Sequence, residues 1–290
     1  METLLALINN PLNSDDFVSY SAEMASDMKF NLHFLYIQNP ALYSLSSGSA
    51  AATAHPVGSE VEITRLEEER KNAVKSIEKK LEDFKKSVSA DININVSSET
   101  GAMDMVVNRL VVEGEADMIL LENQNEEGLW ILDSTNSQLI IKAKCPGWLI
   151  PKGLKYQPYR KIVYATDYNL KDIQVLNNLK DMTGRFSPEI TVLHVTGSGR
   201  KEIEKKPEFE KSIAEQTGND KISVEYIKEE KDRDLGETIN DYAEKADADL
   251  IVLLKENKTF FERIFTPSDT KKVIKKAGLP VLMYHEKVIK

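Results

Sequence analysis

The feature that most constrains this chain is an internal repeat on the scale of a whole domain. Residues 3–37 align without a gap with residues 161–195, at a constant offset of 158 positions. A second block, residues 116–121, matches residues 248–253 at a smaller offset, so the first copy carries additional residues between its two blocks. Self-similarity over this length predicts two copies of one structural unit in tandem.

Each copy predicts five strands with helical segments between them. Short apolar runs bounded by polar segments are typical of strands that are buried on both faces of a parallel sheet. These runs are residues 4–8, 32–37, 92–96, 118–121 and 148–150 in the first copy, and 162–165, 190–195, 222–227, 250–254 and 281–284 in the second copy. The third run of each copy alternates apolar and polar residues, which indicates an edge strand with one solvated face.

The alternation of strands and helices predicts the fold class. Over residues 61–88 apolar residues recur at three- and four-residue steps among charged ones, which predicts a long amphipathic helix. With right-handed crossovers, the pattern predicts an α/β fold of two tandem doubly wound domains, each with a five-stranded parallel sheet. Ligands of such sheets bind beyond the carboxyl ends of the strands, at the point where the strand order reverses.

The repeat also predicts the domain boundaries. We expect one domain at residues 1–151, a linker at 152–158 and a second domain at 159–290. The linker contains Pro and Gly and is short, so the two halves are expected to pack together. The apolar last strands, 148–150 and 281–284, are candidates to pair across the copies. Residues 44–59, rich in Ser, Ala and Gly, belong only to the first copy and predict a surface loop, with a lid or a partner-binding segment as alternatives.

Composition excludes several classes of partner. The formal net charge is −9, from 47 acidic and 38 basic residues, which disfavours nonspecific binding to nucleic acid or to an anionic membrane. No apolar run reaches the length of about 18 residues that a membrane helix requires, and the N-terminus lacks the features of a signal peptide. The single cysteine, Cys145, predicts a core residue rather than a disulfide. We therefore expect a cytoplasmic protein with neither a nucleic acid nor a membrane as partner.

Four segments carry a resemblance to a known family. They are Lys-Ile-Val-Tyr-Ala-Thr-Asp at 161–167, Ile-Thr-Val-Leu-His-Val at 190–195, Ala-Asp-Leu-Ile-Val at 248–252 and the closing segment at 271–282. In this order and spacing they resemble the universal stress protein family. The resemblance covers nearly all of the second copy and extends to the first copy through the repeat.

The resemblance implies a five-stranded parallel domain of the adenine nucleotide alpha hydrolase-like type, commonly dimeric through its last strand. A tandem chain then resembles a dimer formed within one chain. Whether two such chains also form a homodimer is left open. Many members bind ATP. In those members an aspartate at the end of the first strand approaches the nucleotide, and a valine at the end of the second strand lies beside the adenine. In this sequence the resemblance assigns the first role to Asp167, which follows Thr166, and the second role to Val195. The first copy has Asn9 and Ile37 at the same positions.

The phosphate-binding segment departs from the family pattern. That pattern is Gly, two residues, Gly, nine residues, Gly, and then Ser or Thr, because glycines let backbone N–H groups close on phosphate oxygens. None of the three glycines is present after Leu254, only Ser268 keeps its type, and Pro267 lacks a donor. The candidate nucleotide site is therefore Thr166, Asp167, Val195 and Ser268, with Lys255, Lys258 and Arg263 as either cationic contacts or solvated side chains.

Other chemistry finds little support in the sequence. The four histidines lack ligand-like spacing, so we expect no metal site. His194 is more typical of a satisfied strand histidine than of a catalytic base. The alternative role for Asp167 is to cap the helix that follows it. No nucleophile elbow or Walker loop occurs, and the residues predict no catalysis.

Two main hypotheses follow. The first is a non-enzymatic stress-response or regulatory protein with a degraded ATP site and no cofactor, in which an intramolecular pseudo-dimer engages a protein partner or a small ligand. The alternative is an ATP-binding module that uses the second copy, with slow hydrolysis left open. A third hypothesis is an apolar ligand between the halves.

Overall fold

The structure is a computed structural model that describes residues 1–39, 60–85, 92–123, 139–140, 142–167, 171–196, 200–218, 221–228, 235–255 and 278–285. The segment 44–59, singled out in the sequence, lies outside these residues. The chain divides into two compact units. The first unit comprises Met1–Glu122 and Gly153–Tyr156, and the second comprises Asn123–Lys152 and Gln157–Lys290.

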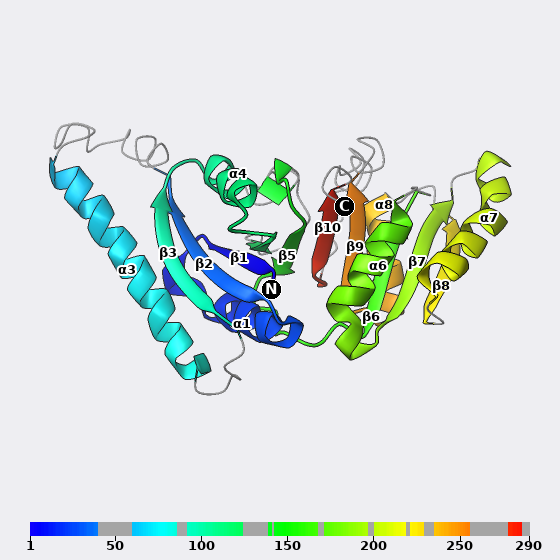
Figure 1. The fold of residues 1–290 in the computed structure, drawn as a ribbon, viewed down its shortest axis with the longest axis horizontal. Coiled ribbons are helices and arrows are strands. Elements are labelled where there is room, and N and C mark those ends of the chain that lie inside the picture. Colours follow the sequence, from blue (N-terminus) through cyan, green and yellow to red (C-terminus); the bar gives the residue numbers. More distant parts are fainter. Residues whose placement is uncertain are drawn as a thin grey trace. The chain divides into compact units, whose positions relative to one another are not determined.

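The first unit is built on four parallel strands in the order β3-β2-β1-β4 (Figure 1). The strands are β1 (Thr3–Ile8), β2 (Asn31–Gln38), β3 (Ile94–Thr100) and β4 (Met118–Asn123). The helices are η1 (Pro11–Asn13), α1 (Asp15–Met28), α3 (Glu60–Lys85) and α4 (Met103–Glu113). The long helix α3 packs on α1, η1, β2 and β3, so its apolar stripe covers part of this sheet.

The second unit contains a sheet in the order β5-β10-β9-β6-β7-β8. All neighbours are parallel except β5, which is antiparallel to β10. Its strands are β5 (Gly147–Pro151), β6 (Lys161–Thr166), β7 (Glu189–Thr196), β8 (Ile222–Lys228), β9 (Leu250–Lys255) and β10 (Val281–His285). Its helices are α6 (Asp172–Thr183), η3 (Gly184–Phe186), α7 (Arg200–Thr217) and α8 (Leu235–Lys245).

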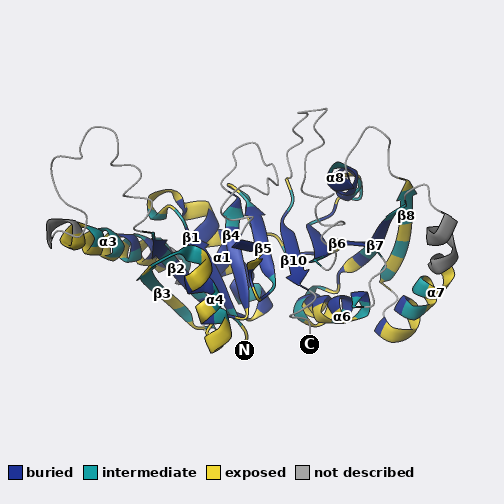
Figure 2. Ribbon diagram, turned by 90° about the horizontal axis from the view of Figure 1, so that it is seen from above, coloured by how far each residue is buried: buried dark blue, intermediate teal, exposed yellow. Residues whose placement is uncertain are grey.

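The sequence prediction of strands is confirmed in both copies. All ten apolar runs form strands, and the runs with alternating polarity, β3 and β8, each pair with a single neighbour in the order of the strands. Figure 2 shows these two strands in mixed colours, whereas β10 is buried along its length. The third strand begins at Ile94 rather than at residue 92, because its pairing with β2 starts at Leu32. The long helix predicted at 61–88 spans Glu60–Lys85.

The predicted pairing of the two last strands is confirmed. Leu149, Trp148 and Gly147 of β5 lie opposite Val281, Leu282 and Met283 of β10. The last strand of the first copy is therefore grouped with the second unit, in which the five strands of the second copy, β10-β9-β6-β7-β8, are all parallel. The boundaries at 151 and 159 describe the repeated sequence and stay a prediction.

The core is apolar, as the sequence predicts. Trp148 and Tyr164 are among its largest fully buried side chains, and Cys145 is buried as expected. In the described parts of the chain, no helix combines the length and the apolar composition needed to span a bilayer.

Candidate functional site

The candidate site lies at the carboxyl edge of the sheet in the second unit. Because β6, β7, β9 and β10 are parallel, their carboxyl ends meet at one edge. From β6 the chain proceeds to β7 and β8 on one side and then returns to β9 and β10 on the other side. The strand order therefore reverses beside β6, which is where ligands of doubly wound sheets bind.

A buried group of polar side chains lies at this end of β6. We define the β6 polar cluster as Tyr164, Thr166, Asp172 and His194. The Tyr164 hydroxyl donates a hydrogen bond to Asp172 Oδ1, and Thr166 Oγ1 donates to Asp172 Oδ2 at 2.5 Å. The Nδ1 of His194 donates to the backbone oxygen of Thr166 at 2.9 Å. All four side chains are buried, with Tyr164 and Asp172 at 0 % exposure.

Local structure explains how the cluster forms. Tyr164 and Thr166 are two residues apart on a strand, so their side chains project to the same face of the sheet. Asp172 is the first residue of α6 and brings its carboxylate to both hydroxyls. A carboxylate in the first turn of a helix is stabilised by the partial positive charge of the helix N-terminus.

The electrostatics keep Tyr164 in its protonated form. Burial, together with the neighbouring Asp172 carboxylate, raises the pKa of Tyr164 well above its ordinary value. The hydroxyl therefore remains a donor across the physiological range. Because a buried carboxylate needs donors for its lone pairs, Tyr164 and Thr166 supply what solvent would otherwise provide.

His194 is held within the sheet. Its Nδ1 carries the proton, because the partner is a carbonyl oxygen, and its ring lies edge-on to Tyr226 at a centroid distance of 6.2 Å. These contacts hold the ring in place within the sheet.

The structure places three of the four predicted site residues at this edge. Thr166 pairs with His194 in register, so Asp167 and Val195 each follow one member of that pair. Both Asp167 and Val195 are partly exposed. Ser268 lies outside the described residues, as do Lys258 and Arg263.

The alternative role for Asp167, as a helix cap, is wrong. The N-cap position of α6 is Lys171, four residues further along the chain. Asp167 thus lies outside α6.

The neighbouring strand ends bring a cation and a second buried histidine to the edge. Lys255 ends β9 and lies in register with His285 of β10. Desolvation by burial, followed by the positive charge of Lys255, lowers the pKa of His285 to about 4. The neutral ring donates through Nε2 to the backbone oxygen of Ile140 at 2.7 Å.

Sequence reasoning missed Tyr164 and Asp172 as members of the site. The sequence signal that could have indicated them is the pair of hydroxyl side chains, Tyr164 and Thr166, within an apolar strand. A buried hydroxyl requires a hydrogen-bond partner, so such residues predict a polar group nearby. No sequence pattern marks the carboxylate of Asp172 as that partner, because only the placement of α6 against β6 brings the two together.

The first copy lacks this cluster. At the offset of 158 positions, Tyr164, Thr166 and Asp172 correspond to Ala6, Ile8 and Ser14. The equivalent turn is instead bonded to α3, since Ser76 Oγ donates to the backbone oxygen of Pro11 at 3.1 Å and Lys80 Nζ donates to that of Leu12 at 3.3 Å.

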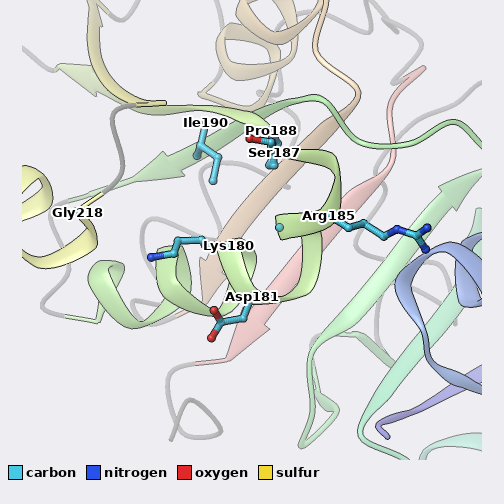
Figure 3. Close-up of a pocket in the computed structure, with 8 residues that line it drawn as sticks. Lys180, Asp181, Arg185, Ser187, Pro188, Ile190 and Gly218 are labelled. Atoms are coloured by element: carbon cyan, nitrogen blue, oxygen red, sulfur yellow. The ribbon is translucent and has the colours of Figure 1, made fainter.

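A separate hollow of about 520 Å³ lies at the opposite end of β7 (Figure 3). Lys180 and Arg185, two of its lining cations, point in opposite directions in Figure 3. Lys180 donates to the backbone oxygen of Thr217, and nearby Lys221 donates to the oxygens of Ser187. Lys180 is thus already engaged with an oxygen of the protein, and the hollow is not the candidate site.

Among the described residues, no group of three or more His, Cys, Asp or Glu side chains is placed to hold a metal ion. The carboxyl edge carries a partly exposed carboxylate, Asp167, and a partly exposed apolar side chain, Val195.

Comparison with known proteins supports the resemblance. Residues 158–285 match the family model described as the universal stress protein family. The comparison with curated proteins found no match.

Three solved structures are similar over nearly the whole chain. A universal stress protein from Archaeoglobus fulgidus DSM 4304 has a TM-score of 0.66 and 13% identity, and covers 97% of this chain and 97% of its own. A putative universal stress protein from Pseudomonas aeruginosa UCBPP-PA14 has a TM-score of 0.59 and 14% identity, with 100% and 95% covered. A functionally unknown protein from Pseudomonas aeruginosa PAO1 has a TM-score of 0.57 and 14% identity, with 100% and 94% covered.

At these identities the likeness shows the fold alone. The chain therefore has the fold of universal stress proteins over nearly its whole length, and residues 158–285 form one universal stress protein domain.

Proposed function

We propose that this chain is a universal stress protein-like regulatory protein of the cytoplasm, which acts by binding rather than by catalysis. In this proposal the chain is a tandem of two related domains, and its remaining ligand site belongs to the second copy. The first copy has a structural role.

The observation that carries the proposal is the β6 polar cluster. It lies at the ligand edge of the second copy, while the first copy has Ala6, Ile8 and Ser14 at the corresponding positions. The residues that match the family model fall on the same copy. A specialised second copy explains both facts.

The sequence of the phosphate segment supports a degraded nucleotide site. Without the three glycines, the backbone has fewer N–H groups free to close on a triphosphate. We therefore propose that ATP is not a cofactor of this protein and that the ligand is a smaller molecule or a protein partner.

A second candidate function is adenine-nucleotide binding by the second copy. It is favoured by the position of Asp167 and Val195 after the paired residues Thr166 and His194. Slow hydrolysis belongs to this alternative. It requires the phosphates to be held by groups other than glycine backbone.

Calorimetric titration of the full chain with ATP and Mg²⁺ separates the two candidates. We expect no binding in the micromolar range, and native mass spectrometry of the purified chain is expected to show a different co-purified ligand or none. Micromolar binding that is lost in Asp167→Asn would overturn the degraded site and support the alternative. The absence of both heat and a thermal shift would overturn the alternative.

The pairing of β5 with β10 supports a proposal about assembly. Because the last strands of the two copies already pair within one chain, we propose an intramolecular pseudo-dimer whose last strands are not free for a second chain. Sedimentation equilibrium is expected to give a monomer. A stable dimer would show that another surface joins two chains.

A further inference from the structure

We propose that Asp172 is a positioning residue of the second copy, whose buried carboxylate fixes the carboxyl end of β6 and thereby holds Asp167 at the ligand edge. This inference rests on the proposed function, because it deepens the same site.

Both oxygens of the Asp172 carboxylate are used to tie α6 to β6. Oδ1 accepts from Tyr164 and Oδ2 accepts from Thr166 at 2.5 Å, and the residue is 0 % exposed. Hydrogen bonds to an ionised acceptor are about twice as strong as those between neutral groups. Two such bonds, from residues two positions apart, hold the carboxyl end of β6 against the first turn of α6.

The tie continues from β6 to β7. The backbone oxygen of Thr166 accepts from His194 Nδ1 at 2.9 Å, so the main chain immediately before Asp167 is fixed by a side chain from the neighbouring strand. Val195 follows His194 directly. Asp167 and Val195, the two residues with predicted ligand contacts, thus directly follow Thr166 and His194, which are both members of the β6 polar cluster.

The comparison of the two copies separates this role from folding. The first copy forms the same strand and the same following helix with Ala6, Ile8 and Ser14, so the fold does not require a buried carboxylate here. Taking a carboxylate out of water is unfavourable, and hydrogen bonds must offset it. A buried carboxylate that the fold does not need, five positions after Asp167 in the sequence, points to the site.

Amide hydrogen exchange of the full chain tests the inference. Asp172→Ser introduces the residue of the first copy, and Tyr164→Phe and Thr166→Val each remove one donor. We expect exchange of the amides at residues 164–167 and 194–196 to become about tenfold faster. Asp181→Ser, which changes an exposed aspartate of the same helix, is the matched control and is expected to leave these amides unchanged.

The pattern of exchange decides the outcome. Unchanged exchange at both strand ends would overturn the inference, and so would an equal increase over the whole second unit, because that marks a role in stability alone. If Asp172→Ser does not fold, Tyr164→Phe keeps the test, since it removes a single hydroxyl. Micromolar binding of Mg²⁺·ATP by the wild-type chain that is lost in Asp167→Asn would count against the proposed function, and the exchange result would still be measured independently.

Discussion

Asp249 and Lys161 form a reciprocal pair at the start of two neighbouring strands. The carboxylate Oδ2 of Asp249 accepts from the backbone N–H of Lys161 at 2.8 Å, while the backbone N–H of Asp249 donates to the oxygen of Lys161 at 2.8 Å. The first copy repeats the arrangement, because Thr3 N donates to Asp117 Oδ2 at 2.8 Å and Asp117 N donates to Thr3 O at 3.0 Å. The repeated Ala-Asp motif therefore sets the register of the fourth strand of each copy against the first.

Replacing this carboxylate should weaken the second unit. Asp249→Ala removes the acceptor for the backbone N–H groups of Arg160 and Lys161, both at 2.8 Å. We expect the free energy of unfolding to fall by about 1–2 kcal/mol, measured by chemical denaturation. The control is Asp247→Asn, which breaks only an exposed ion pair with Lys161 and should change stability by less than about 0.5 kcal/mol. Equal effects of the two variants would contradict a structural role for the motif.

Replacing Val281 by Lys should disrupt the pairing of β5 with β10. Val281 is buried and lies in register with Leu149 and Ile251, so a lysine there places an ammonium group among apolar side chains. We expect a loss of roughly 2–4 kcal/mol in the free energy of unfolding and a lower melting temperature. Val112→Lys, at an exposed position of α4, is the control. An unchanged melting curve for Val281→Lys would rule out a stabilising role for this pairing.

His285 should make stability depend on pH. Its pKa in the fold is about 4, below its ordinary value of 6.5, so the neutral form contributes stability that is fully present above pH 6.5 and is lost as the pH falls toward 4. The linked change over this interval is roughly 3 kcal/mol.

The variant His285→Gln isolates that contribution. It keeps an amide donor for the backbone oxygen of Ile140 but does not titrate. Unfolding free energies measured at several values between pH 7 and pH 4.5 should fall less steeply for the variant than for the wild type. Parallel curves would assign the pH dependence to other groups.

Lys80 should stabilise the turn after β1 in the first unit. Its ammonium contacts Asp15 Oδ2 at 2.6 Å and the backbone oxygen of Leu12 at 3.3 Å, and its side chain is only 13% exposed. We expect Lys80→Ala to lower the free energy of unfolding by about 1 kcal/mol in thermal denaturation. Lys211→Ala removes a more exposed ion pair, with Glu215, and should change it by less than about 0.5 kcal/mol. Equal effects would show that the bonds of Lys80 to this turn are not stabilising.

The sequence by itself determined the strands and the edges of the sheets. Burial on both faces produces an unbroken apolar run, as at residues 250–254, and a half-solvated edge produces alternation, as at residues 222–227. These patterns depend only on which side of the local backbone meets water. They can therefore be recognised in the sequence even when the neighbouring strands and helices are not known.

Part of the candidate site was also predictable. Thr166, Asp167 and Val195 follow from the ends of predicted parallel strands, which must share an edge. The structure brings these three together at the ends of β6 and β7, and Ser268 remains a prediction outside the described residues.

Only the tertiary structure decided the partners of buried polar groups. Asp172 meets Tyr164 and Thr166 because the first residue of α6 lies against the end of β6, and His194 reaches Thr166 because of the register of β7. The grouping of β5 with β10 was decided in the same way, by hydrogen bonds between strands far apart in the chain. A polar side chain has many candidate hydrogen-bond partners in a sequence, and only the folded geometry selects one of them. An apolar face needs only to be removed from water, whichever residues cover it. The sequence pattern therefore predicts buried apolar faces more fully than it predicts hydrogen-bond partners.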